Sequence, residues 1–424
     1  MRNLFILLLI LVAGPGPQLL AKPNPGSKQE PATILTNWMD LQCRLVRNAR
    51  GVPHVAYSRH FSYSAIAAYE SMAGIDPACK SIAGQVNGLE TLPSARGKNL
   101  NVLASVNAAY AHMLRHFYGT FGSSTGSIDS LEKMQADLLA KQKIKGSILT
   151  ESADYGKKIA ALILEWAAKD RSVSTKTYSP AAGQGLWMPS PTAAVPFWSE
   201  TRSFFSTKPA FTYQAPVYSS EKNTDFYQMA DEVYKTGVNL SPEQKATALY
   251  WDDSPDGKYR TVFGHWTHIL SGLIKQQKSS LPMAATAFVK MSMAMQEATI
   301  LAWEGKYQYR VLRPINFIQE NIDKNWKPLI ATPNHPEFPA AHATLSNAAA
   351  TALCKVFGEK CSVVDNAYVD IGMKSRSYAS IKEVAKEAGY SRLYGGIHYR
   401  YSIEQGFLAG EAAARAVEGL VLFL

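Results

Sequence analysis

Residues 334–357 read NHPEFPAAHATLSNAAATALCKVF, a proline-punctuated loop that leads into a run of small and apolar residues. The apolar residues recur at helical spacing and proline is favoured in the first turn of a helix, so the stretch predicts a helix from Pro339 to Phe357. The first turn of a helix has backbone N–H groups without partners and the positive end of the helix dipole. Because His342 lies in this turn, the stretch predicts an anion-binding site beside it.

The helical spacing continues on both sides of this stretch and indicates the fold class. Other segments with apolar residues at three-to-four spacing are 34–46, 54–72, 100–121, 128–141, 147–168, 224–236, 241–251, 264–276, 283–312 and 398–424. Nothing in residues 33–169 alternates apolar and polar side chains in the manner of strands. The sequence therefore predicts an all-α protein.

The length of the chain indicates more than one packed unit. It has 424 residues, of which 46% are hydrophobic, and a single core seldom grows much beyond about 300 residues. We expect two helical bundles, 22–220 and 221–424, with the active site in the C-terminal one. Residues 171–220 interleave six prolines with aromatic side chains. Such a long loop in a compact domain predicts an aromatic strap across the surface, with an interdomain linker as the alternative.

The charge balance favours a small anionic partner. Lysine and arginine outnumber aspartate and glutamate by 44 to 34, which gives a formal net charge of +10. Such an excess is typical of proteins that bind nucleic acid, acidic lipid or oxyanions. The basic residues are scattered without a dense run, and no nucleic-acid-binding motif is recognisable, so nucleic acid is not expected.

The N-terminal residues have the pattern of a secretory signal. Arg2 precedes an apolar run from Leu4 to Ala13, which is followed by glycine and proline. The run is too short to span a bilayer comfortably. We predict a signal peptide at 1–21, ending at Ala21, with an uncleaved anchor as the alternative. The mature chain is then expected to have no membrane span and to be secreted or periplasmic.

Cysteine is scarce for an exported chain of this size. The four cysteines permit two disulfides in three connectivities, among which sequence cannot choose. The local pairings Cys43–Cys79 and Cys354–Cys361 are the expectation. No pair has the spacing of zinc ligands.

Two further motifs carry cations. Lys306 and Arg313 lie seven residues apart near the end of the predicted helix 283–312, so two helical turns place them on one face. Such a pair is usually solvated, but this one lies in an unusually aromatic stretch. Residues 391–398 read SRLYGGIH, where Arg392 offers bidentate oxyanion recognition and two glycines let the backbone turn before His398.

The three motifs, in this order, resemble the superfamily of vanadium-dependent haloperoxidases and type-2 phosphatidic-acid-like acid phosphatases. A wider pattern at 185–189, 197–198, Trp251 and 264–266 is similar to the bacterial haloperoxidase branch. The resemblance covers about residues 185–410. It implies the helical fold expected above, with vanadate as the cofactor.

The resemblance implies that the anion is held by side chains from all three motifs. His398 would bond vanadium as the metal ligand, or would attack phosphorus in a phosphatase. The groups that would neutralise or bond the oxygens are Lys306, Arg313, Arg392 and the backbone N–H of Ala341. These assignments make His398 the residue on which cofactor binding depends.

The resemblance also implies a peroxidase reaction, in which hydrogen peroxide oxidises a halide, iodide or bromide. His342 would be its general acid–base. His335 would contact the halide substrate. His265, in a Gly-His-Trp setting, would lie near the substrate pocket.

Two motifs depart from the family pattern, at three positions. Ala340 and Ala341 stand where serine and glycine are usual, which removes a hydroxyl donor, and Ser402 stands where an aspartate often follows the liganding histidine. Two alternatives therefore stay open. One is an acid phosphatase that uses His398 as nucleophile, and the other is an oxyanion-binding homologue with weakened catalysis.

Overall fold

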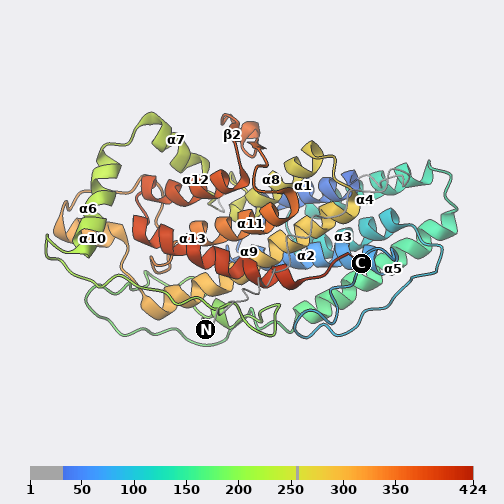
Figure 1. The fold of residues 1–424 in the computed structure, drawn as a ribbon, viewed down its shortest axis with the longest axis horizontal. Coiled ribbons are helices and arrows are strands. Elements are labelled where there is room, and N and C mark those ends of the chain that lie inside the picture. The colour runs from blue at the N-terminus through green and yellow to red at the C-terminus, as the bar shows by residue number, and fades with distance from the viewer. Residues whose placement is uncertain (1–31, 255–256, 424) are drawn as a thin grey trace, which may run out of the picture.

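The computed structural model describes residues 32–254 and 257–423, and Figure 1 shows an elongated molecule built almost entirely of helices. Its described residues contain thirteen α-helices and one antiparallel hairpin, β1 (Val363–Asp365) with β2 (Arg376–Tyr378). The predicted all-α class is thereby confirmed. The predicted signal peptide lies outside the described residues.

The N-terminal bundle is organised around its third helix. Its members are α1 (Thr33–Asn48), α2 (Ala56–Ala73), α3 (Val102–Tyr118), α4 (Ser124–Ala140) and α5 (Gly146–Ala167). Helix α3 packs against each of the other four. Its Tyr110 stacks on Trp38 of α1 with ring centroids 5.7 Å apart. All five helices were predicted from apolar spacing.

The C-terminal bundle surrounds α11. Its members are α6 (Asp225–Val238), α7 (Pro242–Tyr250), α8 (Thr261–Gln276), α9 (Leu281–Tyr309), α10 (Pro314–Asn321), α11 (Ala341–Phe357), α12 (Ile381–Tyr394) and α13 (Arg400–Arg415). Helix α11 packs against α9, α12 and α13, as the orange and red ribbons of Figure 1 show. The helix that begins with the 334–342 motif is therefore at the centre of its bundle.

Helix α9 joins the two bundles. It packs against α2 on one side and against α11 and α13 on another, and one hydrophobic core runs through both bundles. The split of the chain at residue 220 stays a prediction. Even α9, at 29 residues, is not long and apolar enough to cross a membrane, and no other described helix is.

The proline-rich segment 171–220 is fastened to α9 and the turn that follows it. The backbone N–H of Trp187 donates to the Arg310 carbonyl at 2.6 Å. The Tyr213 hydroxyl donates to the Leu301 carbonyl at 3.1 Å. Both aromatic side chains are buried. These contacts agree with a strap rather than a free linker.

Two helices and the hairpin were not predicted. Pro314 ends the pattern of α9, but as the first residue of α10 it also starts a helix, since its fixed φ suits that position. Helix α9 itself ends at Tyr309, where Arg310 adopts a left-handed conformation with φ 49°. The short 3-10 turns of the described chain are Trp198–Glu200, Val369–Ile371 and Ala416–Gly419.

The expected disulfides are wrong. All four cysteines are buried free thiols. Cys43 lies in the core, where its Sγ donates to the Gly264 carbonyl at 3.2 Å, and burial raises the pKa of its thiol to about 12. Cys361 Sγ accepts from Gln277 Nε2 at 3.6 Å. The even number of cysteines and their positions in the sequence gave no information on the distances between the thiols in the fold.

Helices α11 and α13 pack closely against each other. A Cβ added at Gly410 would lie 2.2 Å from the Thr344 carbonyl oxygen, and one added at Gly406 would lie 2.8 Å from that of Ala340. Only glycine permits so close an approach. The two glycines of α13 therefore fix the helix that carries His342 against the helix that follows His398.

Candidate active site

The five residues predicted to hold the anion are all buried and come from different elements of the C-terminal bundle. Lys306 lies in α9, Arg313 caps α10, His342 lies in α11, Arg392 in α12, and His398 just before α13. The charges of Arg313, Lys306 and Arg392 all act on His398, and after burial they are the largest causes that lower its pKa. The fold therefore gathers the three predicted cations around one histidine.

Lys306 is fixed beneath the 334–342 motif. Its Nζ donates to the carbonyls of Pro336, Glu337 and Pro339 at 2.9, 3.0 and 2.7 Å. Burial, followed by the charge of Arg313, lowers the pKa of this ammonium well below its ordinary value, although Glu337 opposes the shift. The three carbonyls therefore hold the amine in one place.

Arg313 connects the first motif to the other two. Its Nε donates to the His335 carbonyl and its Nη1 to the Ile397 carbonyl, both at 2.9 Å. The same Nη1 lies 3.4 Å from His398 Nε2. Since a guanidinium only donates, His398 Nε2 presents its lone pair to Arg313.

His398 is oriented by Glu337. Its Nδ1 lies 2.8 Å from Glu337 Oε1, so Nδ1 carries the proton and Nε2 is the unprotonated nitrogen. The same Oε1 accepts the backbone N–H of Tyr399 at 3.1 Å, and Oε2 accepts the Ser402 hydroxyl at 2.6 Å. Burial raises the pKa of Glu337 to about 7, against lowering by Ser402 and Arg313.

This arrangement explains one departure from the family pattern. The position of the aspartate expected after the liganding histidine is Ser402, and its hydroxyl binds Glu337 instead of the imidazole. The carboxylate partner of His398 therefore comes from the loop before α11. Glu337 lies inside the motif but was given no role from the sequence. It pairs with a histidine 61 residues away, and no local pattern indicates such a distant pair.

His342 faces a buried aspartate. Its Nε2 lies 3.5 Å from Asp253 Oδ2, and neither atom has a hydrogen-bond partner within the described part of the chain. Burial, and next the charge of Arg392, lowers the pKa of His342 to about 3, although Asp253 opposes this. His342 is therefore a neutral imidazole at ordinary pH and can accept a proton.

Arg392 binds the backbone of the loop that contains Asp253. Its Nη1 donates to the carbonyls of Trp251 and Asp252 at 2.6 and 3.4 Å. Its Nε is buried and has no partner among the residues described. A buried guanidinium N–H without a partner is costly, so it marks a place where an acceptor fits.

His265 lies behind Asp253. Its Nδ1 is 3.1 Å from Asp253 Oδ1 and its Nε2 is 2.8 Å from Asp365 Oδ2, and all three side chains are fully buried. Both ring nitrogens are therefore engaged. The sequence predicted His265 to lie near the substrate pocket, but a direct contact with substrate would require one of these ion pairs to break.

His335 forms one wall of the site with Trp303. Their ring centroids are 5.1 Å apart. His335 Nδ1 lies 3.0 Å from Arg313 Nη2, so it accepts and the proton is on Nε2. Burial, followed by the charges of Lys306 and Arg313, lowers the pKa of His335 well below its ordinary value. His335 therefore offers a neutral N–H donor.

The first turn of α11 supplies the backbone donors. Ala341 is its first residue, and the N-cap residue Ala340 makes no side-chain hydrogen bond to the helix. The N–H groups of this turn have no partners within the helix. They lie in the same turn as His342, as the sequence predicted.

The donors of the site fit a tetrahedral or trigonal oxyanion. Four site residues from four separate segments carry a buried polar atom without a partner within the described chain, and these atoms are Arg392 Nε, His342 Nε2, Asp253 Oδ2 and His54 Nε2. Of these, Arg392 Nε is a permanent cationic donor. Arg313 and the N-terminus of α11 add further donors and Lys306 adds positive charge, although its own N–H groups bond the carbonyls of the 334–342 motif, and such surroundings suit an oxyanion.

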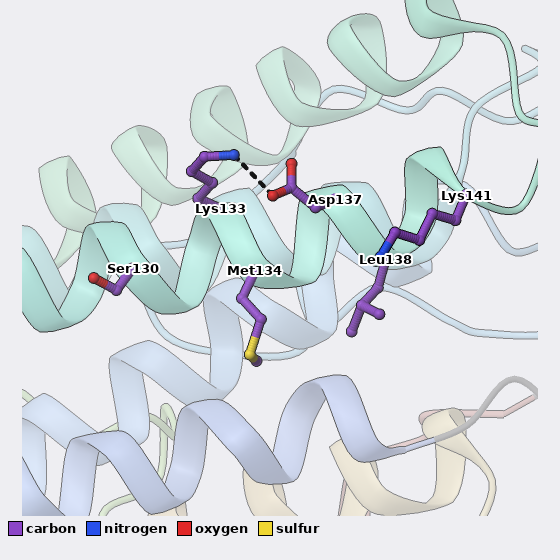
Figure 2. A pocket seen from close by; sticks show the side chains of 6 residues that line it. All are labelled: Ser130, Lys133, Met134, Asp137, Leu138 and Lys141. Carbon is purple, nitrogen blue, oxygen red and sulfur yellow. Dashed lines mark hydrogen bonds and ion pairs between the residues drawn. The ribbon is translucent and has the colours of Figure 1, made fainter.

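A surface pocket elsewhere offers no comparable chemistry. Figure 2 shows its lining residues, which all come from α4 and its C-terminal cap: Ser130, Lys133, Met134, Asp137, Leu138 and Lys141. Its one ion pair, Lys133–Asp137 at 2.7 Å, is solvent-exposed. A concavity on one helix brings together no groups from separate elements, so the buried cluster remains the candidate.

Two further residues were missed from sequence. Asp253 was given no role from the sequence, and only its contact with His342 shows its importance. His54 precedes α2 of the N-terminal bundle, yet protonation of His54 would lower the pKa of both His335 and His342. No local pattern in the sequence connects either residue to the three motifs.

Comparison with known proteins supports the same part of the chain. The family model of the VCPO second helical-bundle domain matches residues 286–422. No curated protein sequence matches the chain. The matched range includes the Lys306 to His398 motifs.

Solved structures extend the similarity over nearly the whole chain. A bacterial vanadium-dependent iodoperoxidase superposes with a TM-score of 0.84 at 30% sequence identity, covering 95% of this chain and 99% of its own. A bacterial vanadium-dependent chloroperoxidase in holo form gives 0.67 at 15% identity, covering 88% and 93%. Its apo form gives 0.67 at 16%, covering 87% and 95%. At these lower identities the chloroperoxidase shares the fold.

Proposed function

The chain belongs to the vanadium haloperoxidase superfamily, and from that premise we propose that it is a vanadate-dependent peroxidase that oxidises iodide or bromide with hydrogen peroxide. The observation that carries the proposal is the state of His398. It is a buried neutral imidazole with Nδ1 held by Glu337 and the Nε2 lone pair beside Arg313. This is how proteins prepare a histidine for a metal, by fixing its tautomer with a carboxylate.

The cofactor would be held by the residues already assembled. His398 Nε2 is the metal ligand, and the oxygens are neutralised by Lys306, Arg313 and Arg392, with the N–H of Ala341 as a further donor. Vanadate, when bound, supplies a Lewis-acid centre that activates hydrogen peroxide for oxygen transfer. Fixed cations around that centre stabilise the charge that develops during the transfer.

His342 would move the proton of hydrogen peroxide. Its low pKa leaves it free to accept that proton, and Asp253 Oδ2 at 3.5 Å is placed to stabilise the imidazolium that forms. Hydrogen bonds of this kind are often long before substrate binds and then tighten. His342 would return the proton when the oxidised halide leaves.

The halide would be handled by His335. Its Nε2–H is a neutral donor on a ring tilted by 49° against that of Trp303, and a large, polarisable anion such as iodide or bromide suits an N–H next to an aromatic ring. Similarity to a protein described as an iodoperoxidase, at 30% identity, supports iodide as the substrate. Iodide is also the easier of the two to oxidise.

One assay tests the proposal. The protein without metal is compared with the protein reconstituted with orthovanadate, in peroxide-dependent iodide oxidation and in phosphoester hydrolysis. We expect vanadate to switch on iodide oxidation. Iodide oxidation that is equal with and without vanadate, or absent in both, contradicts the proposal.

A phosphatase is the second candidate, because a neutral His398 Nε2 beside three cations is also a competent nucleophile toward phosphorus. In that case phosphoester hydrolysis occurs without metal, and vanadate inhibits it. Binding of vanadate without either activity would instead indicate an oxyanion-binding homologue, weakened by Ala340.

A further inference from the structure

His265 is a buried charged group that the proposed reaction does not use directly. It lies in α8, between Asp253 of the preceding loop at 3.1 Å and Asp365 of β1 at 2.8 Å. The three side chains are fully buried. Burying two carboxylates costs several kcal/mol each unless they are paired. His265 pairs with both of them and so compensates this cost.

One side of His265 leads to the proton-transfer residue. Asp253 Oδ1 accepts from His265 and from the Tyr368 hydroxyl, which leaves Oδ2 to face His342. With Oδ1 held by two donors, the carboxylate cannot rotate away. Asp253 also has a positive φ of 52°, a conformation that aspartate adopts more readily than most residues other than glycine.

The other side leads to an anion-binding cation. The ring of His265 stacks on Trp251, with centroids 4.1 Å apart and planes inclined by 22°. The Trp251 carbonyl accepts Arg392 Nη1 at 2.6 Å, and its indole N–H donates to Glu387 at 2.9 Å. The ring of His265 therefore supports the residue whose carbonyl orients Arg392.

We infer that His265, clamped by Asp365, is a positioning residue that sets Asp253 against His342 and the Trp251 carbonyl against Arg392. The inference rests on the proposed function for the part that concerns proton transfer. His265 would then act on the site through Asp253 and Trp251 and would not itself contact substrate. The part that concerns Arg392 requires only that the site binds an oxyanion.

The surroundings of His265 keep it charged. Burial lowers its pKa, but Asp365 and Asp253 outweigh burial and raise the pKa to about 9. The other titratable groups that face it are the Tyr250 and Tyr368 rings and His268 on the next turn of α8. A neutral side chain at this position would leave Asp253 with weaker partners and free to turn.

The test uses the full chain with His265→Gln and Asp365→Asn. Glutamine keeps an amide donor but no charge, and it has no ring to stack on Trp251. We expect turnover of iodide by the vanadate-loaded protein to fall about 10–100-fold, as is typical when a partner of a site residue is lost. Affinity for inorganic phosphate, measured by calorimetry without metal, should fall in the same variants.

A matched control separates positioning from stability. Tyr63 donates its hydroxyl to the buried Asp170 at 3.0 Å in the N-terminal bundle, where its ring packs against Trp166 and Phe204. Tyr63→Phe thus also removes a buried bond to an aspartate. It should lower the melting temperature while turnover and phosphate affinity stay within about twofold of the parent.

A double-variant cycle identifies the route. In a His342→Ala background, His265→Gln should cause no further loss of turnover, because its effect on rate passes through His342. It should still weaken phosphate binding through Arg392. A full additional loss of turnover in that background overturns the proton-transfer part.

The readouts also distinguish this inference from the proposed function. If the parent protein oxidises no iodide, the proposed function fails, but phosphate affinity and the ¹⁵N-histidine spectrum of His342 still test the role of His265. We expect both to change in His265→Gln and neither in Tyr63→Phe. Turnover, phosphate affinity and the histidine spectrum of His265→Gln decide the outcome. If all three stay at the values of the parent, as expected for Tyr63→Phe, His265 is only structural and the inference is wrong.

Discussion

At the scale of single residues, the two histidines of the site have different tasks although they border one anion. His398→Ala removes the metal ligand, so we expect both vanadate binding and iodide oxidation to be lost. His342→Ala removes only a proton acceptor, a contribution of about 10²–10⁴ in rate, so vanadate should still bind. Calorimetry with orthovanadate and iodide oxidation measure the two effects.

The control for this pair is His116→Ala, an exposed histidine of α3 whose ring lies edge-on to Phe117. It should change neither quantity. Equal loss of vanadate in the His342 and His398 variants would mean that ligand and acid–base are wrongly assigned.

Ala340 stands where the resemblance leads us to expect a serine. Its backbone has φ −70° and ψ 110°, which suits an N-cap, yet its methyl group makes no bond to the helix. Ala340→Ser should cap α11, which adds about 1 kcal/mol of stability. The same hydroxyl should tighten vanadate, since a bond to a charged group is worth roughly 1.5–3 kcal/mol.

Thermal unfolding and vanadate titration of Ala340→Ser check the two effects separately. A variant that is more stable but binds vanadate no more tightly would show that the hydroxyl serves only the helix.

At the scale of elements, the site depends on how closely α13 approaches α11. Gly410→Ala would place a Cβ 2.2 Å from the Thr344 carbonyl oxygen, so the helices must separate. We expect a loss of about 1–3 kcal/mol in the free energy of unfolding, the usual cost of overpacking. Phosphate affinity should fall as well, because α11 carries His342. Chemical denaturation and calorimetry measure these changes.

Gly126→Ala is the matched control, since Gly126 also lies within a helix but has open space around its Cα. It should be stabilised slightly by the better helix propensity of alanine. If both variants behave alike, the contact between α11 and α13 does not limit the site.

Elements were predictable from sequence where one signal was clear. Helices with regular apolar spacing, such as α1 and α3, were placed within a few residues. Helix α12 was missed because its Arg392 and the following glycines were interpreted as a loop motif. Helix α10 was missed because Pro314 was used only as a stop signal, although proline also begins helices.

The candidate site was predictable only in its local parts. The cations and histidines stand in short motifs with fixed spacing, so the sequence indicated them. Their carboxylate partners, Glu337, Asp253 and Asp365, were not indicated, because each pairs with a histidine that is distant in the chain. Such pairs are decided by the tertiary fold.

At the scale of the whole molecule, the ion pairs of His265 make stability depend on pH. Its pKa rises from 6.5 in the unfolded chain to about 9 in the fold. The stability it contributes is therefore complete below about pH 6.5 and is lost as pH rises through 9, by roughly 3 kcal/mol. Melting temperatures of the parent and of His265→Gln should converge across this window. A constant difference between them would contradict the raised pKa.

The anion site also has a consequence for how the protein responds to its surroundings. Its donors come from α9, α10, α11, α12 and the turn before α13, so the unfolded chain has no site at all. An anion that binds there stabilises the folded state only. At a concentration one hundred times its Kd it raises the free energy of unfolding by about 2.7 kcal/mol. The melting temperature should therefore climb with added phosphate or vanadate, and a heat scan would report occupancy of the site without any enzymatic assay.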